Sequence, residues 1–200
     1  MCSSDLYQSV SPFRREKPRL SEKNFDVCVV GHLRRVKDPL RTAIAARLLP
    51  VSSRIRVIHL GGPLSSIEEA RARKETMSNP RYKWLGEVLP ARVRRVMSQS
   101  RLFVISSRME GGANALGEAI VAGLPVLASR IEGSVGILGD DYPGCFEVGD
   151  TEELARLMFR CETDPVFLAD LAKRCRSLAG LFDPALEQAA WRKLLEELSH

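Results

Sequence analysis

The sequence predicts one doubly wound α/β domain built around a parallel sheet. Short apolar runs alternate with helical patterns along the chain, and 44% of the 200 residues are hydrophobic, enough for the core of one ordinary domain. Alternation of this kind is typical of strands that helices cover on both faces. In such sheets, ligands bind at the carboxyl ends of the strands.

The first half of the chain carries three strand–helix pairs. Each predicted strand is a short apolar run, and each following stretch has apolar residues at helical spacing. The pairs are expected at Val27–Val30 and Pro39–Leu49, at Ile55–Leu60 and Ser65–Met77, and at Tyr82–Leu85 and Pro90–Ser98.

The second half continues the alternation. A strand at Leu102–Ile105 precedes a helix at Asn114–Ala122, which ends at a glycine with a proline just beyond, as helices commonly do. A strand follows at Pro125–Leu127, and a helix at Thr151–Arg160 has an acidic first turn that suits the helix dipole. The last predicted helix runs from Pro184 to Leu198, with Asp183 as its cap and one apolar side formed by Leu186, Ala189, Ala190, Leu194 and Leu195.

Composition excludes several classes of protein. No run approaches the ~20 apolar residues of a membrane span, and no apolar N-terminal segment resembles a secretion signal, so a soluble cytoplasmic protein is expected. Five cysteines without a close pair argue against a disulfide framework, and Cys28 reads as a small core residue. His32, His59 and His200 have no metal-ligand spacing, so no metal is expected. No cofactor is expected either.

The charge is unevenly distributed. Residues 1–110 carry 22 Lys and Arg against 10 Asp and Glu, whereas residues 111–200 carry 8 against 15. The basic residues are dispersed and no aromatic platform accompanies them, so we expect an anion-binding cleft and no nucleic-acid partner.

A glycine-rich loop with two flanking carboxylates points to that cleft. Glu110 and Glu118 are separated by seven residues, and Gly111, Gly112 and Ala113 lie between the strand and the helix that begins at Asn114. The unpaired N–H groups of a helix's first turn attract a diphosphate, which small residues allow to approach closely. Glu118 lies on the same face of this predicted helix as Asn114, so its carboxylate is expected to accept hydrogen bonds from a ribose. Glu110 is expected to lie in the loop, nearer the sugar. Two glutamates at this spacing also occur on ordinary solvated helices.

Two other phosphate-binding patterns are absent. The chain has no Gly-x-Gly-x-x-Gly after its first strand and no Gly-x4-Gly-Lys-Ser/Thr. These absences argue against a Rossmann dehydrogenase and a P-loop NTPase.

The Glu110-to-Glu118 segment resembles the Glu-x7-Glu signature of the family 4 glycosyltransferases, which have the two-domain GT-B architecture and use nucleotide-sugar donors. Residues 31–39 are similar to the loop Gly-Arg-Leu-x-x-x-Lys-Gly that closes the donor site in that family. Gly31 and Lys37 fall on the family's Gly and Lys, but His32 stands at the Arg position, so Arg34 or Arg35 is expected to replace its phosphate contact. The alternative for Lys37 is a surface residue before a helix.

Two further segments resemble the family. Residues 60–63 look like its Gly-x-Gly-Pro turn, and residues 84–88 look like the segment that contacts the base, although Trp84 is expected in the core. The resemblance implies catalytic roles for Glu110 and Lys37, a donor site that includes Gly31, His32, Arg34, Gly111, Gly112, Ala113, Asn114 and Glu118, and metal-independent transfer.

Within the family, the chain is most similar to the selenosugar synthases of selenoneine biosynthesis over residues 24–198. The similarity lies in residues 30–34, 37–40, 109–114 and 139–144. It implies UDP-N-acetylglucosamine as donor and selenophosphate as small-molecule acceptor.

The resemblance also implies a domain organisation. Residues 24–200 match the C-terminal nucleotide-sugar-binding domain of a GT-B enzyme, so the chain is expected to pack against an N-terminal acceptor domain that it lacks, and to be an inactive fragment alone. Residues 1–23 are polar and contain proline, which predicts a linker, and residues 1–6 resemble a translated sequencing adapter. Two alternatives stay open: a non-catalytic nucleotide-sugar sensor or half-enzyme, and, less favoured, a basic nucleic-acid-binding module.

Overall fold

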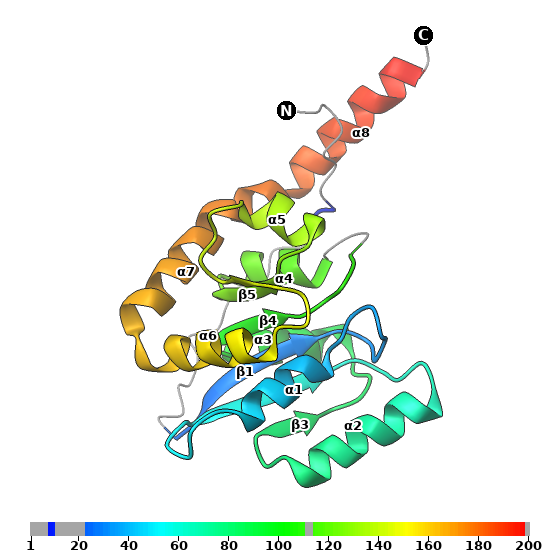
Figure 1. Cartoon of the computed structure of the whole chain (residues 1–200). Coiled ribbons are helices and arrows are strands. Elements are labelled where there is room, and N and C mark those ends of the chain that lie inside the picture. The colour runs from blue at the N-terminus through cyan, green and yellow to red at the C-terminus, as the bar shows by residue number, and fades with distance from the viewer. Residues whose placement is uncertain (1–7, 11–22, 111–113, 199–200) are drawn as a thin grey trace.

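Six parallel strands form one sheet between two layers of helices in the computed structural model, which describes residues 8–10, 23–110 and 114–198 (Figure 1). The strand order is β3-β2-β1-β4-β5-β6. The strands are β1 (Phe25–Val30), β2 (Ile55–Leu60), β3 (Tyr82–Trp84), β4 (Leu102–Ile105), β5 (Val126–Ser129) and β6 (Cys145–Phe146). The predicted doubly wound α/β fold is therefore confirmed.

Helices cover both faces of the sheet, as right-handed parallel crossovers require. One layer holds α1 (Leu40–Arg47), α2 (Ser66–Ser78) and α6 (Thr151–Thr163), and the opposite layer holds α3 (Pro90–Gln99) and α4 (Asn114–Val121) (Figure 1). Helices α5 (Glu132–Leu138) and α7 (Pro165–Leu178), the 3-10 turn η1 (Ala179–Phe182) and α8 (Pro184–Leu198) complete the chain.

The central strands are buried on both faces. Every residue of β4 and β5 is buried, so these strands have uninterrupted apolar runs instead of the alternation of a half-exposed strand. Cys28 in β1 is fully buried, as predicted, and burial raises the pKa of its thiol well above the ordinary value. Trp84 is half-buried and packs against the core, also as predicted.

The predicted elements are observed, with small shifts at their ends. Four elements of the described residues that the sequence did not reveal are α5, β6, α7 and the 3-10 turn η1. Helix α5 contains two glycines, which weaken a helical pattern, and β6 has only two residues. For helix α7 the sequence does contain a start signal, an aspartate followed by a proline at Asp164 and Pro165. In the structure, the Asp164 carboxylate accepts hydrogen bonds from the backbone N–H groups of Val166 and Phe167, both at 3.0 Å.

The order of the strands reverses between β1 and β4. The chain moves outward from β1 through β2 to β3, and then returns to place β4 on the other side of β1. The loops that leave β1 and β4 consequently run to opposite faces of the sheet and open a crevice at its carboxyl edge.

Helix α8 projects from the body of the domain (Figure 1). Its start is capped as predicted, because the Asp183 carboxylate accepts a hydrogen bond from Ala185 N at 2.9 Å. Its large apolar side chains Leu186, Trp191, Leu194 and Leu195 are exposed. None of the described helices combines the length and the apolar character needed to cross a membrane.

Candidate functional site

A pocket of about 490 Å³ lies at the reversal point of the sheet. Its walls come from the loops after β1, β2, β3 and β4 and from the first turns of α4. Sequence-predicted residues gather here from distant parts of the chain: Gly31, His32, Lys37, Glu110, Asn114 and Glu118 all line it. The remaining lining residues are Val30, Leu60, Gly61, Glu87, Val88, Pro90, Val93, Ile105 and Ala115.

Glu110 and Lys37 form an ion pair at one side of the pocket. The Lys37 Nζ donates to Glu110 Oε2, and the Ser107 hydroxyl donates to Glu110 Oε1. The Glu110 side chain is only 2% exposed, whereas that of Lys37 is 32% exposed and still reaches solvent. The pair therefore presents a buried carboxylate behind a cation that an incoming anion can contact.

The loop that carries Lys37 is fastened to the end of β4 through Asp38. Asp38 has a positive φ of 40°, a conformation that Asp tolerates better than most residues. Its carboxylate accepts hydrogen bonds from Arg41, at 2.8 and 3.1 Å, and from Arg108 at 3.3 Å. The Ser106 hydroxyl donates to Asp38 O at 2.8 Å. These contacts hold the Lys37 loop against the segment that leads to Glu110.

Helix α4 points its first turns at the pocket. Asn114 opens the helix and Glu118 follows one turn later, so both lie on the same side. Burial raises the pKa of Glu118 above its ordinary value, and the positive charge of Arg94 partly offsets this effect. A half-buried carboxylate of this kind is a strong acceptor for hydroxyl groups. Gly111, Gly112 and Ala113, which the sequence also assigns to the site, lie outside the described residues.

His32 faces the pocket from the loop after β1. The backbone N–H of Gly62 donates to its Nδ1 at 3.2 Å, which leaves Nε2–H of the neutral ring as a donor. Glu87, which lies in a segment with family resemblance but was not itself predicted as a site residue, lines the same pocket. A Cβ built on Gly62 would lie 3.2 Å from the Glu87 carboxylate and 3.5 Å from His32 Nδ1. The side chains of Glu87 and His32 therefore both lie beside Gly62.

A buried histidine that the sequence did not assign to the site supports this loop. His59 is fully buried in β2, and its Nε2 lies 2.8 Å from Gly31 O while its Nδ1 lies 2.7 Å from the Tyr82 hydroxyl. Because a carbonyl can only accept, the ring donates through Nε2 and accepts from Tyr82 through Nδ1. Burial lowers the pKa of His59 from 6.5 to about 4, so the neutral ring holds Gly31 in place at physiological pH.

The stability of the domain is expected to fall between neutral and mildly acidic pH because of His59. Below pH 6.5 the unfolded chain binds a proton at this residue that the folded chain binds only near pH 4. The free energy of unfolding should therefore drop by about 2 kcal/mol from pH 7 to pH 5 through this group alone. Urea unfolding at both pH values measures the drop, and a His59→Gln variant, which can still donate and accept, should show a drop smaller by that amount. An unchanged pH dependence in the variant would contradict this assignment.

Arg34, the remaining sequence-predicted residue, does not line this pocket. The N–H groups of Lys37 and Asp38 both donate to Arg34 O, at 3.0 and 3.1 Å, and Arg34 lines a neighbouring pocket on the other side of this turn. Its predicted contact with a phosphate in the first pocket stays a prediction. Within the ranges 8–10, 23–110 and 114–198, no group of three or more His, Cys, Asp or Glu side chains is arranged to hold a metal ion.

The fold is shared with proteins of known structure that were solved with UDP bound. HepE from Anabaena, solved with UDP and glucose, aligns with a TM-score of 0.72 and 22% identity over 88% of this chain and 48% of its own. The pneumococcal O-GlcNAc transferase GtfA, solved with UDP and GlcNAc, aligns with a TM-score of 0.74 and 17% identity over 97% of this chain and 38% of its own. A TarM variant of S. aureus, solved with fondaparinux, α-GlcNAc-glycerol and UDP, has a TM-score of 0.75 and 15% identity over 93% and 38%.

The chain thus spans about half the length of HepE and a smaller share of the other two proteins. At these identities the similarity establishes the fold, a Rossmann-like α/β domain. A search among curated proteins gave no match. The family described as "Glycosyl transferases group 1" matches residues 10–179, most of the sequence, and the chain belongs to this family.

Proposed function

We propose that this domain binds the UDP-sugar donor of a glycosyltransferase in the pocket lined by Lys37, Glu110 and Glu118. The observation that carries the proposal is the convergence of these three side chains, from two loops and a helix, at the reversal point of the sheet. Membership of the glycosyltransferase family supports it. Fold neighbours solved with UDP support it as well.

The donor diphosphate would bind between Lys37 and the start of α4. Both carry positive potential, one as a full charge and the other as the partial charge of a helix N-terminus. When the bond between the sugar and the diphosphate breaks, the diphosphate leaves with the electron pair. Fixed positive groups next to the leaving oxygen stabilise that charge without having to reorganise.

The ion pair of Lys37 with Glu110 gives the two residues linked roles. A diphosphate competes with the Glu110 carboxylate for the Lys37 ammonium, which is the more exposed partner. Glu110, still held by Ser107, is then free to accept a hydrogen bond from a sugar hydroxyl. Glu118 would accept hydrogen bonds from the ribose, which compensate for its partial burial.

The assignment of a donor sugar, an acceptor and a partner domain rests on the sequence resemblance. We propose a family 4 enzyme that transfers N-acetylglucosamine from UDP to selenophosphate without a metal, and that works with an N-terminal acceptor domain. The exposed apolar side chains of α8 offer contact surface for such a domain. Calorimetric comparison of UDP-N-acetylglucosamine with UDP-glucose and UDP-galactose tests the donor sugar.

Binding of UDP to this chain tests the proposed function. In buffer with a chelator, UDP should bind to the unaltered chain, and Glu118→Ala should weaken binding at least about tenfold because hydrogen bonds to a carboxylate are lost. Glu152→Ala, which removes an exposed carboxylate from the first turn of α6, is the matched control and should bind UDP normally. Equal affinity of both variants, or no affinity in the unaltered chain, would contradict the proposal.

A further inference from the structure

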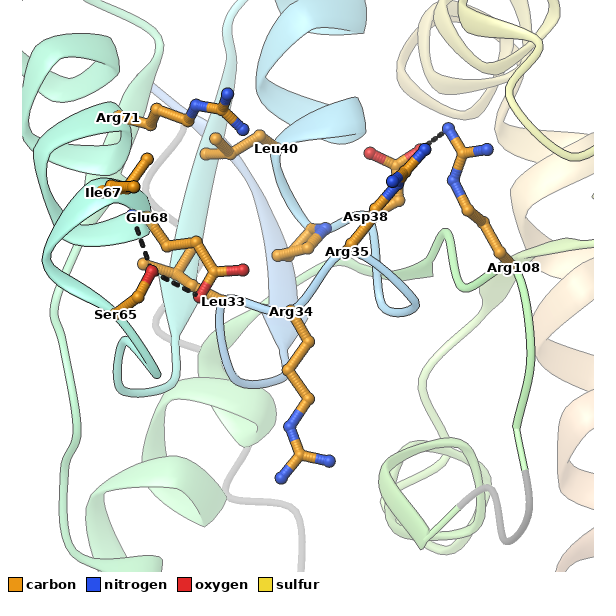
Figure 2. A pocket seen from close by; sticks show the side chains of 11 residues that line it. Leu33, Arg34, Arg35, Asp38, Leu40, Ser65, Ile67, Glu68, Arg71 and Arg108 are labelled. Carbon is orange, nitrogen blue, oxygen red and sulfur yellow. Dashed lines mark hydrogen bonds and ion pairs between the residues drawn. The ribbon is translucent and has the colours of Figure 1, made fainter.

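A second pocket of about 460 Å³ lies at the same edge of the sheet as the first, and Figure 2 shows the side chains that line it. It is bounded by residues 33–40 of the loop after β1, by the first turns of α2, and by Arg108 after β4. A parallel bridge between Leu33 and Pro63 joins the loops after β1 and β2. Leu33 lines the second pocket, and none of the described residues lines both pockets.

Positive charge dominates the lining of this pocket. Its lining contains four arginines, Arg34, Arg35, Arg71 and Arg108, and two carboxylates, Asp38 and Glu68. The Asp38 carboxylate is already shared by Arg41 and Arg108, and Glu68 lies beside the Ser65 hydroxyl at 3.4 Å. The pocket therefore keeps an excess of two positive charges.

Three of the four arginines, Arg34, Arg35 and Arg71, form no ion pair or side-chain hydrogen bond with any of the described residues. Figure 2 shows Arg71 extending from α2 on one side of the pocket and Arg35 from the loop on the other. Guanidinium groups with free donors on two sides of a pocket suit an oxyanion that accepts several hydrogen bonds, such as phosphate.

The pocket also has an apolar part. Leu33 and Pro39 are buried, and Leu40 and the exposed Ile67 complete this surface between the arginines. A cavity of this size holds more than a bare ion, because small-molecule pockets begin at about 300 Å³.

From these features we infer a second binding site, for a phosphate group carried on a small organic molecule, distinct from the donor pocket. Arg35 and Arg71 hold the phosphate from two sides, and the carbon skeleton lies against Leu33 and Ile67. Inorganic phosphate shares the recognised group but lacks the skeleton. It therefore binds more weakly than a phosphate monoester.

Titration with inorganic phosphate, glucose 6-phosphate and glucose, followed by NMR at constant ionic strength, tests the inference on the whole chain. Glucose 6-phosphate should bind and shift the amide signals of residues 65–71, glucose should not bind, and inorganic phosphate should bind less tightly. A double variant Arg35→Gln/Arg71→Gln should weaken binding by about tenfold or more, because two charge-assisted contacts are lost. Lys173→Gln/Arg192→Gln removes the same charge from two exposed helix positions and should leave the affinity unchanged.

The outcomes separate this site from the donor site. Glu118→Ala, which is expected to bind UDP more weakly, should keep its affinity for glucose 6-phosphate. Equal affinity for inorganic phosphate and glucose 6-phosphate would overturn the inference that the ligand is an organic phosphate, and would indicate a site for the free ion. Binding that survives the Arg35/Arg71 double variant but disappears in Lys37→Met would place the phosphate in the donor pocket and overturn the second site, as would no binding at all.

Discussion

Replacing Gly61 with alanine is expected to cost at least about 4 kcal/mol of folding free energy, among the largest effects of any single substitution in this domain. A Cβ on Gly61 would lie 2.0 Å from Gly31 O and 2.4 Å from its carbonyl carbon. These atoms belong to the backbone and cannot rotate away. Gly61 also has a φ of 148°, which side chains rarely adopt. Relief of the clash requires the β1 and β2 loops to separate, which would also deform the proposed donor pocket.

Urea unfolding of Gly61→Ala measures this cost. The matched control is Gly136→Ala in α5, where a Cβ meets nothing within 4 Å and φ is ordinary. That variant should be as stable as the unaltered domain or slightly more so, since alanine favours a helix over glycine by about 1 kcal/mol. Similar stability of the two variants would show that the loops do not approach each other as described.

Replacing Lys37 with methionine should lower both stability and donor affinity. The Glu110 side chain, 2% exposed, would lose its cation and, among the described residues, keep the hydrogen bond from Ser107. We expect a loss of about 2 kcal/mol of folding free energy, less than for a fully buried pair because Lys37 is partly exposed. UDP affinity should fall about a hundredfold, because a charged contact to the diphosphate disappears.

A double variant separates the two effects. Lys37→Met/Glu110→Gln removes the uncompensated charge, so urea unfolding should show most of the lost stability restored. UDP affinity, measured by calorimetry, should stay low because the cation is still missing. If the double variant were no more stable than Lys37→Met, the ion pair would not be the cause of the loss, and a recovery of UDP binding would exclude Lys37 as a phosphate ligand.

The layered fold could be predicted from the sequence because its strands are short apolar runs buried on both faces. The runs at residues 55–60 and 102–105 appear in the structure with the predicted bounds. Helix α5 and strand β6 could not be predicted in this way, since glycines interrupt the first and the second is too short to show a pattern. Both depend on tertiary packing.

Only part of the candidate site could be predicted from the sequence. The spacing of Glu110 and Glu118 predicted that both would face one pocket, and they do. The pairing of Lys37 with Glu110 spans 73 positions and follows from the fold, as does the support of Gly31 by His59. Arg34 lines the second pocket because the turn at Arg34 to Asp38 places it and Lys37 on different sides. Linear spacing does not encode such a turn.

A crystal structure of this chain with UDP tests the central claim most directly. The proposal predicts the diphosphate within hydrogen-bonding distance of Lys37 Nζ and near the first turn of α4, and the ribose hydroxyls within reach of the Glu118 carboxylate. It also predicts that the ion pair between Lys37 and Glu110 is broken or shared with the diphosphate. UDP bound elsewhere, for example among Arg35 and Arg71, with the first pocket unoccupied and that ion pair intact, would contradict it.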